Sequence, residues 1–274
     1  MAFKNAIGFG VAGNFAGHLE QAGEAADFKQ VEVKELHQPK AIFPFYVPHF
    51  EGSFLSVYPL SADTLRFPQD ADNLQIEPEV AIVCEIEYDQ NQQVTALYPK
   101  SFGAYNDCSI RRPNANKIAD KKNWGEQTKG LSATLIPLDG FEAGCNLDQY
   151  RIACFHQRGA ELNIYGVDSP TVGYSYFHQK LLNWIVDRMN HQPDQGPMHH
   201  IAELLQKADY PKQVIISIGA TRYTEFGETH FLQPGDVSMV VVYNGNKYSA
   251  EQIVEMAKKQ QFNGDLSALV QKVI

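Results

Sequence analysis

The sequence predicts an α+β fold in which β-strands predominate. Short segments of alternating or continuous apolar residues recur throughout the 274 residues, whereas segments with helical periodicity are few. Strands and helices do not alternate regularly, which argues against a parallel sheet built from β-α-β units. The composition, with 44% hydrophobic and 20% charged residues, is that of a globular protein with a substantial core.

The periodicity of the apolar residues locates the individual elements. Strands are predicted at residues 30–36, 73–89, 133–137, 150–156, 161–165, 213–220 and 237–243. Helices are predicted at residues 14–28, 174–189, 197–208, 249–260 and 265–273. The pattern is clearest at 174–189, where Leu181, Ile185 and Met189 share one helix face.

Two further segments lack a regular pattern. Residues 38–60 contain four prolines, which predict an irregular or edge segment because proline cannot donate to a central ladder. Residues 100–130 are rich in polar and turn-forming residues and are predicted to be loops. Lys117, Lys121 and Lys122 lie in this segment, and we interpret this basic cluster as part of a solvated loop.

Charge and cysteine content limit the class of protein. The net charge of −9 argues against a nucleic-acid partner, because phosphate binding depends on clustered lysine and arginine. No run of 18 apolar residues is present, so no membrane span is predicted. The four cysteines form no C-x-x-C pair, which favours reduced thiols and a cytoplasmic location.

The opening glycines Gly8, Gly10 and Gly13 spell G-x-G-x-x-G, the phosphate-binding pattern of dinucleotide folds. That pattern requires a buried strand before its first glycine, and only residues 5–7 are available here. Residues 38–60 are also broken by proline where a second crossover helix is required. The sequence therefore favours a dinucleotide-dependent oxidoreductase less than either of the two functions described below.

Three carboxylates form a candidate metal site. Glu77 and Glu79 are two residues apart on a predicted strand, so both side chains project from the same face. Asp107 follows in a predicted loop, flanked by Asn106 and Ser109. Hard oxygen ligands of this kind suit Mg²⁺ or Mn²⁺, with water or substrate completing the coordination.

Several short motifs follow one another in an order that resembles the fumarylacetoacetate hydrolase family. They are GNFAGHLEQAG, PKAIFPF, IEPEVAIV, AYNDCSIR, KG and FLQPGDV, and they extend to about residue 243. The resemblance implies a β-roll of mixed sheets that forms a homodimer. It also implies an N-terminal lid and small α/β segment at 1–60 and a catalytic domain at 61–243. Residues 244–274 have no counterpart in the family and are predicted to be a C-terminal helical extension of the same unit.

The resemblance implies roles for individual residues. Glu77, Glu79 and Asp107 match the metal-binding carboxylates, while Arg111 and Thr221 match substrate-binding positions.

Two further residues match the catalytic machinery of the family. Lys129 matches the lysine that stabilises developing negative charge, and His18 matches a catalytic histidine on the lid. The opening glycines would then serve as a hinge. One departure concerns Gln21, which stands where the family has a glutamate three residues after the histidine.

The resemblance therefore implies an enzyme that acts on a small 2-oxo acid through a metal-bound enolate. The reaction classes are C–C bond hydrolysis, decarboxylation and keto–enol tautomerisation. Gln21 cannot stabilise an imidazolium as a carboxylate does, so we expect decarboxylation or tautomerisation in preference to hydrolysis. The alternative is a protein of the same fold that has lost or changed this chemistry and serves as a binding or structural module.

Overall fold

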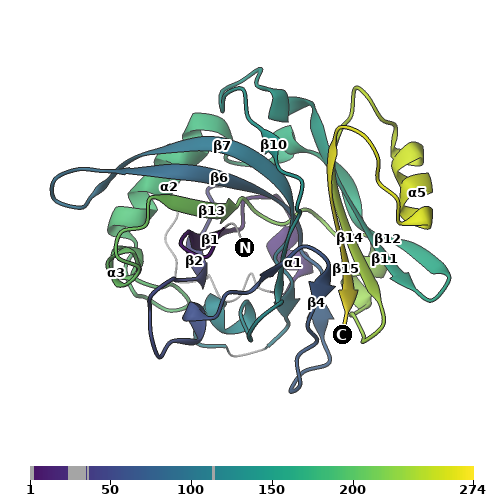
Figure 1. Cartoon of the computed structure of the whole chain (residues 1–274), viewed down its shortest axis with the longest axis horizontal. Helices are drawn as coiled ribbons and strands as arrows, with labels where there is room; N and C mark the ends of the chain where they lie inside the picture. Colours follow the sequence, from purple (N-terminus) through teal and green to yellow (C-terminus); the bar gives the residue numbers. More distant parts are fainter. Residues whose placement is uncertain (1–2, 24–34, 36, 113–114) are drawn as a thin grey trace.

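Two β-sheets form the framework of the protein (Figure 1). A computed structural model describes residues 3–23, 35, 37–112 and 115–274. The strands are β1 (Ile7–Ala12), β2 (Ala41–Tyr46), β3 (Leu60–Ser61), β4 (Thr64–Leu65), β5 (Leu74–Gln75), β6 (Pro78–Tyr88), β7 (Val94–Asn106), β8 (Ser109–Ile110), β9 (Lys129–Leu131), β10 (Ile136–Pro137), β11 (Tyr150–Arg158), β12 (Glu161–Pro170), β13 (Gln213–Ser217), β14 (Val237–Asn244) and β15 (Leu266–Val273). The α+β, mainly-β fold class is confirmed.

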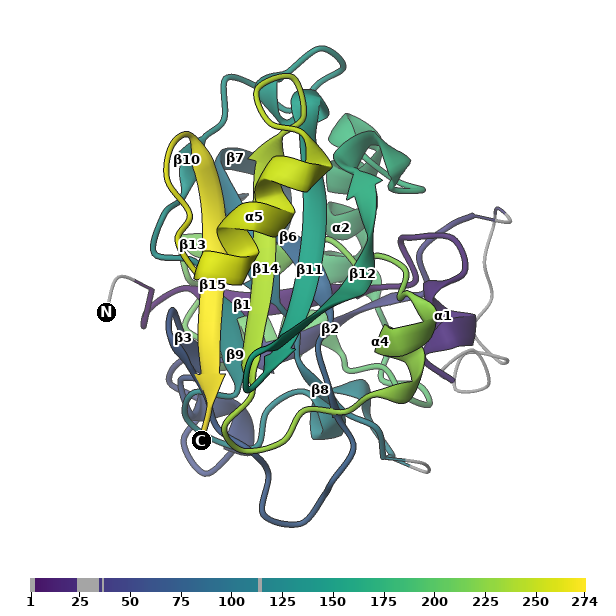
Figure 2. The same cartoon turned by 90° about the vertical axis from the view of Figure 1, so that its right-hand side faces the viewer.

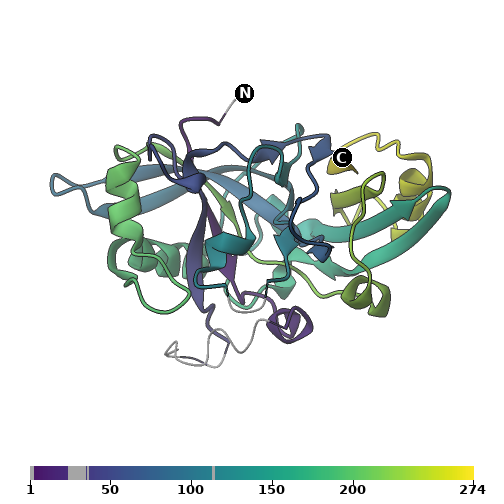
Figure 3. The ribbon, with the colours of Figure 1, turned by 90° about the horizontal axis from the view of Figure 1, so that it is seen from below.

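The helices lie around the sheets. They are α1 (His18–Gln21), α2 (His178–His191), α3 (Ile201–Lys207), α4 (Glu225–Thr229) and α5 (Ala250–Lys259), with the 3₁₀ helices η2 (Phe54–Ser56), η3 (Ile118–Lys121), η4 (Asn146–Gln149) and η5 (Thr171–Gly173). Helices α2 and α3 lie at one end of the molecule and α5 at the other (Figure 1 and Figure 3). In the described part of the chain, no helix has the length and apolar character needed to cross a membrane.

The larger sheet has the strand order β2-β1-β13-β6-β7-β9-β3, with β10 beside β7. Strands β6 and β7 pair antiparallel along most of their length, and β1 runs parallel to β13. Strand β2, which contains Pro44, lies at one end of the order, so the edge prediction for residues 38–60 is confirmed.

The second sheet has the order β12-β11-β14-β15-β4, and α5 lies across its outer face (Figure 2). Both faces of β14 are covered, which explains its continuous apolar sequence. Val240 and Val242 belong to the main core, whereas Met239 and Val241 cluster with Ile253 of α5. This packing joins the helix to the sheet by apolar burial.

The hinge interpretation of the opening glycines is wrong for Gly8 and Gly10. Both lie in β1, which is buried and paired with a strand on each side. A Cβ atom at Gly8 would overlap the ring of Phe45, and one at Gly10 would overlap the ring of Phe43. These glycines are therefore needed for close packing, and the two rings leave no room there for a phosphate.

Two other predicted elements differ from the structure. Residues 265–273 were expected to be helical, but 266–273 form β15, which pairs antiparallel with β14. Pairing with β14 explains the difference. Successive side chains of β15 point to opposite faces of the sheet, and one set packs against α5 while the other lies in the main core. Residues 100–106, expected to be loop, complete the 13-residue strand β7.

Several predictions from the sequence are not tested by the described residues. The strand predicted at 30–36 and the end of the helix predicted at 14–28 lie largely outside the described residues. The three segments at 1–60, 61–243 and 244–274, the homodimer and the cytoplasmic location stay predictions.

Candidate active site

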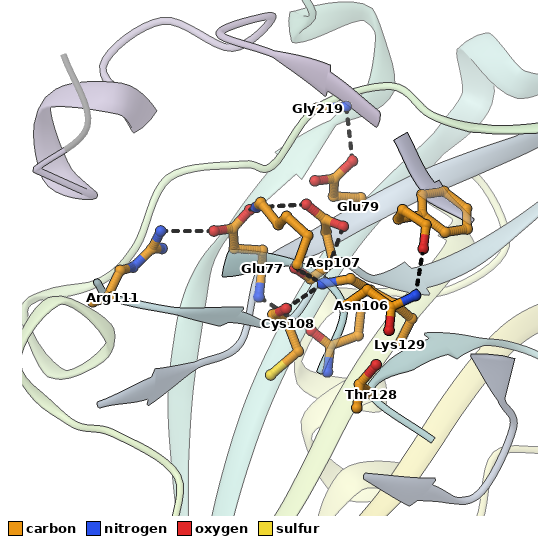
Figure 4. A network of polar contacts seen from close by, with 12 residues as sticks. Glu77, Glu79, Asn106, Asp107, Cys108, Arg111, Thr128, Lys129 and Gly219 are labelled. Atoms are coloured by element: carbon orange, nitrogen blue, oxygen red, sulfur yellow. Dashed lines mark hydrogen bonds and ion pairs between the residues drawn. The ribbon is translucent and has the colours of Figure 1, made fainter. Parts of the chain in front are cut away.

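The three carboxylates meet where β6 begins and β7 ends. The antiparallel register pairs Pro78 with Asn106, so Glu77 and Glu79 lie beside the residue that follows β7, Asp107. One carboxylate oxygen from each residue lies within 4.8 Å of one from each of the others, and all three residues are buried. Figure 4 shows the three side chains pointing toward a common region. The convergence of this carboxylate triad was expected from the sequence.

Lys122 also belongs to this cluster, and its assignment to a solvated loop is wrong. Only 2% of the residue is exposed. Its Nζ lies 2.7 Å from Glu77 Oε2 and 2.6 Å from Asp107 Oδ2. The sequence signal was weak, because only the apolar pair Ile118 and Ala119, buried in η3, marks this polar segment as part of the core.

Arg111 approaches the triad from the loop after β8. Its Nη1 lies 2.8 Å from Glu77 Oε1, as Figure 4 shows, and its Nη2 donates to the Tyr223 hydroxyl at 2.8 Å. Its Nε donates to Gln75 Oε1 at 2.5 Å. The guanidinium therefore holds Glu77 from the side opposite Lys122.

Lys129 is fully buried in β9 and supports the Asp107 loop. Its Nζ donates to the carbonyl oxygen of Asp107 at 2.8 Å and to that of Cys108. The same Nζ lies 3.4 Å from Asp107 Oδ1. Burial lowers the pKa of Lys129, and the charge of Asp107 opposes that effect. Lys129 thus places a positive charge beside the triad.

His18, the first residue of α1, is buried beside Thr221. Its Nδ1 lies 2.9 Å from the carbonyl oxygen of Thr221. Because a carbonyl oxygen can only accept, Nδ1 carries the proton and Nε2 has the lone pair in the neutral ring. The hydroxyl of Thr221 is buried and, among the described residues, makes no hydrogen bond.

Gln21 connects α1 to a different segment. Its Nε2 donates to the carbonyl oxygen of Tyr223 at 3.2 Å and to a carboxylate oxygen of Glu228. Its Oε1 accepts from the Tyr223 amide at 2.9 Å. The amide therefore uses both donor and acceptor capacity to hold α1 against the segment that contains Thr221.

The charges around Glu77 favour its ionised form. Burial by itself would raise the pKa of Glu77, but Lys122 and Arg111 outweigh it and the pKa is lowered. His18 contributes in the same direction. Glu77 is therefore the carboxylate of the triad that most firmly keeps its negative charge.

The other two carboxylates have raised pKa values. Burial and the charges of Asp107 and Glu77 raise the pKa of Glu79, against a 2.9 Å hydrogen bond from the Gly219 amide. Burial also raises the pKa of Asp107, although Lys122 opposes this shift. The site therefore keeps carboxylates of unequal acidity close together.

All seven residues singled out from the sequence lie in this region. The buried carboxylate triad has the hard oxygen donors that a metal ion such as Mg²⁺ requires, and it could bind one. The seven are His18, Glu77, Glu79, Asp107, Arg111, Lys129 and Thr221. Their individual roles stay predictions, and Lys122 joins them as the residue that sequence reasoning missed.

Solved structures share this fold at low sequence identity. Cg1458, crystallised with an inhibitor, has a TM-score of 0.57 at 14% identity over 98% of this chain and 77% of that one. The apo form of 2-keto-3-deoxy-D-arabinonate dehydratase has a TM-score of 0.53 at 11% identity, covering 100% and 74%. A 5-carboxymethyl-2-hydroxymuconate delta-isomerase from Mycobacterium smegmatis has a TM-score of 0.52 at 14% identity, covering 98% and 78%.

These likenesses confirm the predicted fumarylacetoacetate hydrolase-like fold. No curated protein matches the sequence. Residues 24–273 match the family DUF5718, which is described as a family of unknown function. The chain therefore belongs to the DUF5718 family and has the fumarylacetoacetate hydrolase-like fold.

Proposed function

We propose that the protein is an enzyme that acts on a small 2-oxo acid and uses Mg²⁺ or Mn²⁺. The observation that carries this proposal is the convergence of Glu77, Glu79 and Asp107 in a buried cluster beside Lys129 and His18. The names of two fold neighbours, a dehydratase and an isomerase, support an enzymatic role. They do not select one reaction.

The triad would hold the metal, since its three carboxylates are buried and close enough to share one ion. When bound, a divalent cation supplies Lewis acidity that stabilises negative charge on a substrate oxygen. Lys129 adds a fixed positive charge on the Asp107 side of the site. Its hydrogen bonds to two carbonyl oxygens hold the ammonium in place, so no reorganisation is needed as charge develops.

Arg111 and Thr221 are the proposed substrate-binding residues. The contacts of Arg111 support a positioning role as well, because its guanidinium already engages Glu77 and Tyr223. The hydroxyl of Thr221 is buried without a partner among the described residues, so it can form a hydrogen bond to substrate without breaking one to the protein.

His18 would move the proton. The carbonyl oxygen of Thr221 fixes the tautomer of the neutral ring and leaves Nε2 as the basic nitrogen. Gln21, which stands where the family has a glutamate, is a neutral amide engaged with Tyr223 and Glu228. A base without a carboxylate at that position favours decarboxylation or tautomerisation over hydrolysis, which needs an activated water.

The test compares oxaloacetate decarboxylation with acetylpyruvate cleavage in the presence of Mn²⁺. We expect the wild type to decarboxylate oxaloacetate faster than it cleaves acetylpyruvate. We expect Asp107→Asn to abolish the Mn²⁺-dependent rate, whereas Arg112→Met, outside the site, keeps it. His18→Gln should lower the rate on a tautomerisable 2-oxo acid by about 10²–10⁴-fold if His18 is the base.

Two outcomes would overturn parts of this proposal. Fast acetylpyruvate cleavage by the wild type would reject the preference against hydrolysis. The absence of turnover with every short 2-oxo acid, while Mn²⁺ still binds, would favour the non-catalytic alternative.

A further inference from the structure

The ammonium of Lys122 lies between two members of the carboxylate triad. It is 2.7 Å from Glu77 Oε2 and 2.6 Å from Asp107 Oδ2, the distances of charge-assisted hydrogen bonds. A metal ion held by these two oxygens would need the position that the ammonium occupies. The cation and the Lys122 side chain in this conformation therefore exclude each other.

The surroundings of Lys122 show a built site for its ammonium. The Nζ lies 5.1 Å from the centre of the Phe43 ring, within range of a cation–π interaction. The next residue, Asn123, donates from Nδ2 to the carbonyl oxygens of Phe45 at 2.8 Å and Val57 at 3.1 Å. These contacts fix the backbone beside the triad, so a displacement of the ammonium would have to occur by rotation of the lysine side chain.

Three positive groups already surround the triad without a metal. The ammonium groups of Lys122 and Lys129 and the guanidinium of Arg111 pair with Glu77 and Asp107. A divalent cation added to this set would meet repulsion from all three positive groups. A doubly negative 2-oxo acid or oxalate that binds with the metal would cancel the added charge.

We propose that Lys122 is an internal counter-ion that a divalent metal must displace, so that metal and dianionic ligand bind as a pair. The wild type then binds Mn²⁺ weakly alone and more tightly together with oxalate. This inference rests on the proposed function, because it takes the triad as the metal site. Lys122 is then the residue that makes the affinity for the metal depend on the bound substrate.

The test measures Mn²⁺ binding by calorimetry and by electron paramagnetic resonance, with and without oxalate. Lys122→Met removes the competing ammonium, so we expect its affinity for Mn²⁺ alone to rise about tenfold or more over the wild type. We expect the gain in affinity from oxalate to be smaller in Lys122→Met. Lys117→Met is the matched control, because Lys117 pairs with Asp194 outside the triad; it should behave as the wild type.

A second readout protects the test against poor folding of Lys122→Met. In metal-free buffer this variant should melt below the wild type, and Mn²⁺ should raise its melting temperature by more than it raises that of the wild type. Lys122→Arg keeps the positive charge and should keep weak Mn²⁺ binding. Equal Mn²⁺ affinity in the wild type and Lys122→Met would overturn the inference.

The same measurements distinguish failure of the proposed function from failure of the inference about Lys122. If Lys122→Met gains Mn²⁺ affinity but no variant turns over a 2-oxo acid, the displacement holds and the catalytic proposal fails. If no variant binds Mn²⁺ even with oxalate, the triad is not a metal site and both proposals fail.

Discussion

The Nζ atom of Lys122 lies 2.6 Å from Asp107 Oδ2, and the two side chains are 3% and 0% exposed. Removing one partner of such a buried pair leaves an uncompensated charge, which typically costs about 3–5 kcal/mol. The pair therefore contributes to the conformation of the Asp107 loop as well as to the charge of the site. Neighbouring ion pairs and buried polar groups can be tested separately.

Arg111→Met should lower the free energy of unfolding by about 3 kcal/mol, because it leaves Glu77 buried with one counter-ion fewer. Arg112→Met is the matched control. Arg112 pairs with the exposed Asp70, so its loss should cost less than about 1 kcal/mol. Urea unfolding at pH 7 measures both. Equal small losses would show that Arg111 does not stabilise the carboxylate.

Gly8→Ala should destabilise the protein by about 1–3 kcal/mol, since the added methyl group overlaps the Phe45 ring in a packed core. The cost arises from this overlap, so Gly8→Ala combined with Phe45→Leu should lose less than the sum of the two single changes. A double-mutant cycle by urea unfolding measures the coupling. Strict additivity would contradict the packing explanation for Gly8.

Thr221→Val should leave the free energy of unfolding within about 0.5 kcal/mol of the wild type, because the removed hydroxyl makes no hydrogen bond among the described residues. Thr171→Val is the control: its hydroxyl donates to the carbonyl oxygen of Leu147 at 2.6 Å, and its loss should cost about 1–3 kcal/mol. In calorimetry with Mn²⁺, Thr221→Val should weaken oxalate binding about 3- to 10-fold. Unchanged oxalate affinity would argue against a ligand contact for Thr221.

The stability contribution of Asp236 should depend on pH. Burial alone would raise its pKa, but hydrogen bonds from Arg158, His156 and the Gln233 amide lower it. A carboxylate whose pKa is lowered on folding stabilises the folded state above its unfolded pKa of about 3.9. That contribution is lost as the pH falls through the folded pKa.

We therefore expect Asp236→Asn to cost about 2–3 kcal/mol at pH 7 and progressively less below about pH 4. Urea unfolding of both proteins across this range gives the difference. Asp265→Asn, which removes an exposed pair with Lys247, should cost much less than Asp236→Asn at pH 7 and show no such pH dependence. A loss at Asp236 that stays constant down to pH 3 would contradict the pKa argument.

The sequence by itself determined the fold class, the strands β6, β11, β12, β13 and β14, and the carboxylate triad. These features depend on local patterns that survive in the folded chain. Alternation along residues 78–88 places Val80 and Ile82 in the main core and Ala81 and Val83 in a second cluster. The spacing of Glu77 and Glu79 follows the same two-residue rule, and a resemblance in motif order brought Asp107 to them.

Tertiary structure alone decided the environments of Lys122, Gly8 and Gln21. A lysine in a polar segment has the same local pattern whether it faces water or two buried carboxylates. The difference comes from the β6–β7 pairing, which brings together Glu77 and Asp107, the two partners of Lys122. The sequence predicts a hinge at Gly8, but in the structure the ring of Phe45, 37 positions away, packs against this glycine. Contacts between distant segments depend on strand pairing and packing, which local periodicity does not encode.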